Sequence, residues 1–144
     1  MKRNRRKKGQ SLVELALVFP FFLLIVVGGI IDFGFAFYNF LTLQQITNDV
    51  AEWAAEKLDT ENETAVIEKA IALRPSWWSD AYTVQTPEWH DLDTGGRYVK
   101  VLITYNSPTY TPFYQTMLQA TSGDPTLKLA AMASYKVPEF VTTR

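Results

Sequence analysis

The chain has 144 residues, enough for one compact domain plus an anchor but too few for two large domains. Its net charge of −1 hides an asymmetry, because six of the fourteen basic residues lie in the first eight positions and residues 9–144 hold 8 basic against 15 acidic residues. This acidic body argues against a nucleic-acid partner, and the absence of cysteine excludes disulfides, thiolate metal sites and a cysteine nucleophile.

A long apolar segment follows the basic cluster. The 17 residues between Glu14 and Asp32 carry no charge, which is the lower limit for spanning a hydrocarbon core about 30 Å thick. The alternative is the buried core helix of a soluble protein. The excess of Lys and Arg before the segment predicts a cytoplasmic N-terminus and an extracytoplasmic remainder. Because no Ala-x-Ala-like cleavage site closes the segment, we expect it to be retained as an anchor.

Glu14 is an unusual carboxylate at the edge of this apolar span. A carboxylate that enters the bilayer centre costs about 2–3 kcal/mol and usually has a partner. Gln10 lies four residues earlier, on the same helical face. If the chain were cut after Gly9, the new amino group of Gln10 would be a cation on this face, and Glu14 could pair with it in its own subunit or in a neighbour. The alternative is a carboxylate that reaches the lipid headgroups.

The basic leader, Gly9, Glu14 and the apolar helix together resemble a prepilin-type (class III) signal. The resemblance implies that a membrane peptidase cleaves after the glycine on the cytoplasmic side, that the new N-terminus is commonly methylated, and that the apolar helix is kept for assembly. The chain is still more similar to the TadE-like pseudopilins of the Tad (tight adherence, Flp) pilus system. The residues that carry this similarity are Gly9-Gln10-Ser11-Leu12-Val13-Glu14, Pro20, Ile31-Asp32-Phe33-Gly34, and Ala51, Ala54 and Ala55.

The apolar span contains a proline and several glycines. Pro20 removes one backbone hydrogen bond, so we expect a kink there. Gly28, Gly29 and Gly34 are small enough to let another helix approach closely, although glycine is also ordinary in transmembrane helices. The aromatic stretch 33–40 departs from the family pattern, which more often places arginine or another polar residue there.

Helical spacing continues beyond the span. Apolar residues recur at three and four positions up to residue 58, so a single helix of about 70 Å is expected from residue 12 to 58, half anchor and half spine. The sequence from Thr60 to Glu63 predicts a capping box, with Thr60 at the N-cap, for a second helix. The apolar stripe of that helix consists of Val66, Ile67, Ala70 and Ile71, with Pro75 beyond its end.

Three strands are predicted in the last third of the chain, at residues 82–85, 98–105 and 127–137. A turn at residues 93–96 predicts that the first two strands form a hairpin, and residues 113–120 predict a short helix. The expected fold is α+β and pilin-like, with a small antiparallel sheet of about three strands packed on the spine helix. The expected domains are a leader at 1–9, a transmembrane and spine helix at 10–58, and an extracytoplasmic α+β domain at 59–144.

The outer domain offers little chemistry. His90 is the only histidine, and the segment Glu88–Asp93 around it is more typical of a solvated loop than of a metal site. No Gly-rich phosphate loop follows a strand. We therefore expect no catalytic residue, no metal, no cofactor and no small-molecule substrate.

The expected function is that of a minor pseudopilin of a Tad/Flp-type pilus, held in the bacterial inner membrane and processed between Gly9 and Gln10. The expected partners are the membrane, a prepilin peptidase, other pilins or pseudopilins, and the pilus assembly platform. The first alternative is an unprocessed single-pass protein whose outer domain is a binding module of the same secretion system. The second is a membrane-anchored enzyme or metal-binding module that uses the Glu88–Asp93 loop.

Overall fold

The computed structural model describes residues 4–57, 62–78, 82–93 and 95–138. They form two compact units. Of the described residues, those up to 35 and those from 109 to 125 form the first unit, and those from 36 to 108 and from 126 to 138 form the second. The helix α1 (Asn4–Lys57) passes through both units.

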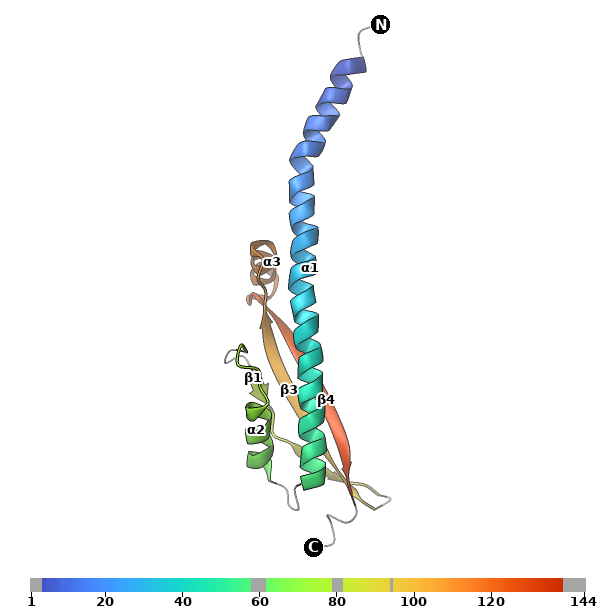
Figure 1. The fold of residues 1–144 in the computed structure, drawn as a ribbon, viewed down its shortest axis with the longest axis vertical. Helices are drawn as coiled ribbons and strands as arrows, with labels where there is room; N and C mark the ends of the chain where they lie inside the picture. Colours follow the sequence, from blue (N-terminus) through green and yellow to red (C-terminus); the bar gives the residue numbers. More distant parts are fainter. Residues whose placement is uncertain (1–3, 58–61, 79–81, 94, 139–144) are drawn as a thin grey trace. The chain divides into compact units, whose positions relative to one another are not determined.

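From Gln10 to Val27, α1 is an apolar helix whose side chains are exposed. The helix is long and apolar enough to cross a membrane. Pro20 lies inside it, and α1 bends in the blue part that contains this proline (Figure 1). Pro20 has no N–H to donate to the Ala16 carbonyl, which explains a bend at this point.

The first unit also contains the short helix α3 (Pro112–Ser122), which confirms the predicted short helix with slightly wider bounds. Thr111 is its N-cap in extended conformation and Pro112 occupies the first turn, where a missing N–H costs nothing. Gly123 ends the helix with φ 74°, a left-handed conformation that favours glycine, and its N–H donates to the Gln119 carbonyl.

In the second unit, α1 is followed by the helix α2 (Glu63–Ala72). Its N-cap is Asn62, whose side-chain oxygen accepts a hydrogen bond from Ala65 N at 3.0 Å. The prediction that Thr60 caps this helix is therefore wrong, and Thr60 itself lies outside the described residues. Asparagine is at least as good an N-cap as threonine, so the helix begins two residues later than the capping-box pattern implied.

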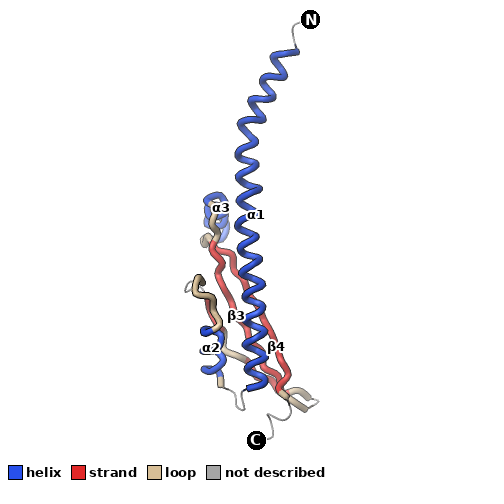
Figure 2. Tube along the Cα trace, viewed as in Figure 1, coloured by secondary structure: helices blue, strands red, loops and turns tan. Residues whose placement is uncertain are grey.

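The sheet is antiparallel and centred on the long strand β3 (Arg97–Pro108). The strand β4 (Thr126–Val137) pairs with β3 along its whole length, as Figure 2 shows. The short strands β1 (Tyr82–Val84) and β2 (Glu88–Asp91) pair with successive parts of β3. The predicted turn at residues 93–96 joins β3 to β2, a strand that the sequence did not indicate. The strand β1 also pairs with β3, as predicted, but β2 lies between them along the chain. Gly95 and Gly96 supply the positive φ angles of this turn.

The core of the second unit lies between the spine part of α1 and one face of the sheet. Alternate residues of β3 are buried, as expected for a strand with one face on a helix. Leu43 and Val50 of α1 are fully buried, and each contributes about 2 kcal/mol by leaving water. The expected α+β, pilin-like fold is confirmed. The fully buried apolar core residues are Leu43, Val50, Ala51, Ala54, Val66, Ala70, Val99, Val101 and Ile103.

Candidate functional site

The predicted processing segment lies on α1. Gly9 is helical, and the side-chain amide of Gln10 donates to Glu14 Oε1 at 3.2 Å. The spacing of four residues therefore does place position 10 and the carboxylate on one face. Cleavage after Gly9 would convert the backbone N–H of Gln10 into a charged amino group near the same face, and the side-chain amide of Gln10 would remain.

Asp32 ends the uncharged stretch, yet its side chain is only 1% exposed. Its Oδ1 accepts the backbone N–H of Tyr110 at 2.6 Å and that of Thr111 at 3.1 Å, and Oδ2 accepts the Thr111 hydroxyl. A buried carboxylate is tolerated when charge-assisted hydrogen bonds replace water. Asp32 therefore holds the segment that starts α3, and its charge lies at the positive end of that helix.

Gly28 and Gly29, two of the three glycines in the apolar part of α1, allow α3 to lie close to α1. A Cβ on Gly28 would meet the Thr111 Oγ1 at 3.2 Å, and a Cβ on Gly29 would meet the Tyr114 hydroxyl at 2.7 Å. The helix that approaches α1 closely at these positions is thus the chain's own α3. A Cβ on Gly34 would meet nothing within 4 Å, so no close contact among the described residues explains that glycine.

Aromatic rings surround the same contact. Tyr114 donates its hydroxyl to the Ile25 carbonyl at 3.2 Å, and its ring meets Phe33 edge-on with centroids 5.6 Å apart. Tyr110 packs against Phe35 with centroids 4.9 Å apart. A groove of about 480 Å³ in the same unit is lined by apolar residues of α1 between Pro20 and Ile31 and by Thr111 and Pro112.

Sequence reasoning found Asp32 and the glycines but missed Tyr110, Thr111 and Tyr114, which complete this site. They lie 78 and more residues along the chain from Asp32. The available signal was local: a threonine followed by proline is a good start for a helix, and residues 101–123 contain no charge. The pairing with Asp32 itself has no sequence signature.

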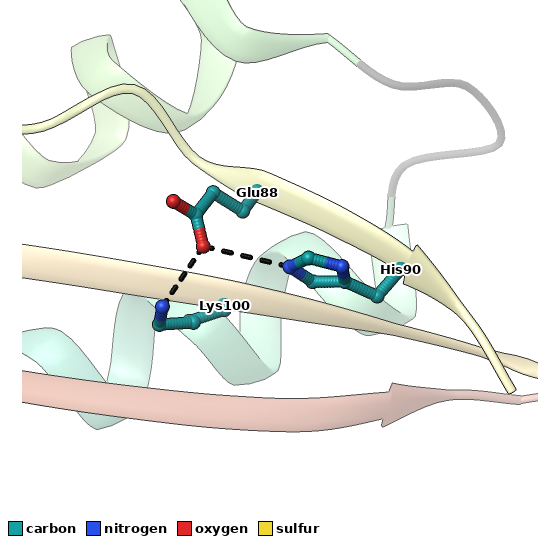
Figure 3. A network of polar contacts seen from close by, with 3 residues as sticks. All are labelled: Glu88, His90 and Lys100. Atoms are coloured by element: carbon teal, nitrogen blue, oxygen red, sulfur yellow. Dashed lines mark hydrogen bonds and ion pairs between the residues drawn. The ribbon is translucent and has the colours of Figure 1, made fainter.

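The segment Glu88–Asp93, considered above as a metal loop, is largely the strand β2. Glu88 Oε2 accepts from the Lys100 ammonium at 2.8 Å and lies 3.5 Å from His90 Nε2 (Figure 3). The hydrogen bond from Lys100 lowers the pKa of Glu88, and the same bond raises the pKa of Lys100. Asp91 pairs in turn with Arg97 at 3.0 Å. These carboxylates already face cations across the β2–β3 ladder, which is a structural role.

Among the described residues, no group of three His, Cys, Asp or Glu side chains could hold a metal ion.

A second buried polar network, which the sequence did not indicate, lies in the core of the second unit. Trp78 Nε1 donates to Asn39 Oδ1 at 3.1 Å, and Asn39 Nδ2 donates to Ser107 Oγ at 2.9 Å. The Trp78 ring stacks on Tyr105 with centroids 4.2 Å apart. All of these groups satisfy one another, so the network fixes the position of α1 on the sheet and offers no open binding site.

Comparison with known proteins gives one result. Residues 9–52 match the family model described as TadE-like protein. This match covers the predicted processing segment, the apolar part of α1 and the beginning of its spine part. No curated protein and no solved structure matches the chain.

Proposed function

We propose that the protein is a minor pseudopilin of a Tad (tight adherence, Flp) pilus, because residues 9–52 match the family model described as TadE-like protein. In this proposal it is a structural assembly component and not an enzyme. One observation carries the proposal: the family match includes an exposed apolar helix on which Gly9, Gln10 and Glu14 have the prepilin spacing.

The apolar part of α1 is the anchor in this proposal. An exposed apolar helix surface of this length is unfavourable in water and favourable in a bilayer. The basic cluster of residues 2–8 keeps the N-terminus in the cytoplasm, and the α+β part of the chain lies outside the inner membrane. There it meets other pilins or pseudopilins and the assembly platform.

Processing is the second step. A prepilin peptidase cuts between Gly9 and Gln10 on the cytoplasmic side, removing the basic leader. The amino group of Gln10 then pairs with Glu14, either in its own subunit or in a neighbouring one, and neutralises a carboxylate that would be costly in lipid.

The cut is tested by mass spectrometry of the protein extracted from membranes of cells with an active prepilin peptidase. We expect a chain that begins at Gln10. We expect the Gly9→Ala variant to keep residues 1–9, because a prepilin-type signal is cut directly after a glycine. The matched control is Gly34→Ala, which makes the same change on the same helix away from the cut and should leave processing intact.

An intact leader in the unsubstituted protein would overturn the processing step. It would favour the alternative of an unprocessed single-pass protein, whose Gly9→Ala variant keeps both its migration and its function. Co-purification with the major pilin or with the assembly platform then separates a pilus component from an unrelated membrane protein, because only the former is retained on a tagged partner after extraction in mild detergent.

A further inference from the structure

The helix α3 has an apolar face that is wider than its contact with α1. Tyr114 lies on the side of α3 that contacts α1, whereas Phe113 and Met117 occupy the adjacent strip and are 36% and 39% exposed. Gln115 and Gln119 lie on the opposite side of the helix and are exposed. The helix is therefore amphipathic, and part of its apolar face is uncovered in the first unit.

The segment that contains α3 carries no charge. From residue 101 to residue 123 there is no acidic or basic side chain and no histidine. A surface helix of an ordinary soluble domain usually carries charged residues on its exposed face. A helix with exposed Phe and Met on one side and polar Gln side chains on the other fits the boundary between headgroups and acyl chains.

The contacts within the first unit place α3 at a defined level of α1. Tyr114 is bonded to Ile25 and packs on Phe33, and Tyr110 packs on Phe35. The helix α3 thus stands beside the last turns of the apolar stretch. Aromatic rings gathered at one end of a transmembrane segment are typical of the membrane–water interface.

Asp32 is the charge that would normally mark the end of the span. Its carboxylate is bonded to two backbone N–H groups and one hydroxyl of α3's N-terminal segment, and it is buried. A carboxylate satisfied in this way does not need water, so the membrane can extend past Asp32 to the aromatic rings.

We propose that α3 is an interfacial helix that lies in the outer headgroup layer of the bilayer, with Phe113 and Met117 in the lipid and Gln115 and Gln119 toward water. This inference rests on the anchoring step of the proposed function but not on processing or on pilus assembly. Because α3 is neutral, its binding to the bilayer depends on apolar area and requires no anionic lipid.

The test uses the absence of cysteine in the chain. Single cysteines are introduced by Met117→Cys, Phe113→Cys, Gln119→Cys and Phe22→Cys, labelled with the environment-sensitive fluorophore NBD, and the full chains are reconstituted in phosphatidylcholine vesicles. Quenching is measured with doxyl-labelled phosphatidylcholine from the lipid side and with iodide from the water side. Gln119→Cys is the matched control on the polar side of α3, and Phe22→Cys reports on the span itself.

We expect blue-shifted emission and several-fold stronger quenching by doxyl lipid at positions 117 and 113 than at position 119, with the opposite order for iodide. Equal iodide quenching at positions 117 and 119, with position 22 quenched by lipid, would overturn the inference and leave the anchor intact. Protection of position 117 from both quenchers would also overturn it, because protein and not lipid would then cover this face. Absence of lipid quenching at position 22 would overturn the anchoring step itself.

Discussion

A buried carboxylate is expensive unless its hydrogen bonds are replaced, and Asp32 meets that condition through partners far along the chain. Tyr110 and Thr111 present backbone N–H groups that have no helical partner, because they precede the first turn of α3. The carboxylate satisfies them, and the N-terminus of α3 in return stabilises the charge. At this scale one residue fixes the end of one helix on the side of another.

Replacing Asp32 by Ala tests this contact. The change leaves two N–H groups without an acceptor and should cost about 2 kcal/mol locally, which is a roughly thirtyfold loss of amide protection. Hydrogen exchange of Tyr110 and Thr111 in detergent micelles measures it. The control is Asp49→Ala, an exposed carboxylate on the same helix. Unchanged protection at both amides in Asp32→Ala would show that water replaces the carboxylate there.

At the scale of elements, α3 and α1 approach closely because glycine removes the obstacle. Gly29 faces the Tyr114 hydroxyl, which donates to Ile25. The nearby Gly34 has open space around the position of a Cβ. The same residue type therefore serves a packing contact at one position and has none at the other.

This difference gives a matched pair of variants, Gly29→Ala and Gly34→Ala. Both should raise the helix propensity of α1 by the same amount, about 1 kcal/mol, so their difference isolates the contact with Tyr114. We expect Gly29→Ala to displace the Tyr114 hydroxyl and to reduce the protection of the α3 amides by about 1 kcal/mol relative to Gly34→Ala, as measured by hydrogen exchange. Equal exchange in the two variants would contradict the close packing.

At the scale of the whole molecule, the stability of the second unit depends on aromatic residues that join its elements. Tyr82 lies on β1, packs on Trp78 and donates its hydroxyl to the Ala70 carbonyl of α2 at 3.0 Å. Burial raises the pKa of Tyr82 to about 12. Because the native pKa is higher than the unfolded value of about 10, this group stabilises the fold fully below pH 10, and the contribution is lost as the pH rises through 12.

Unfolding in guanidinium chloride, followed by tryptophan fluorescence in detergent, tests this dependence. The parent should lose about 2–3 kcal/mol more than Tyr82→Phe between pH 9 and pH 12. At pH 8 the variant should be less stable by about 1 kcal/mol, because the bond to Ala70 is missing. Tyr135→Phe on β4 controls for removal of a hydroxyl. Identical slopes for the parent and Tyr82→Phe above pH 10 would contradict the assignment.

The helices were largely predictable, because their signals are local. The apolar run, its proline and the three-and-four spacing that follows it fix α1, and a proline after a threonine marks the beginning of α3. The cap of α2 was misassigned, since two good cap residues lie two positions apart and the sequence alone does not choose between them. The strand β2 was missed because its charged residues resemble a loop until Lys100 and Arg97 pair with them across the ladder.

The sequence by itself determined the apolar helix, the Gly9–Glu14 spacing and the alternation of β3, all of which depend on residues a few positions apart. It also singled out Asp32, as the charge that ends the apolar stretch. Only the tertiary structure decided what that charge binds, which glycines are in contact and where Asn39, Trp78 and Ser107 meet. The physical reason is that hydrogen bonds and close packing between distant segments depend on the folded path of the chain, and no local spacing records it.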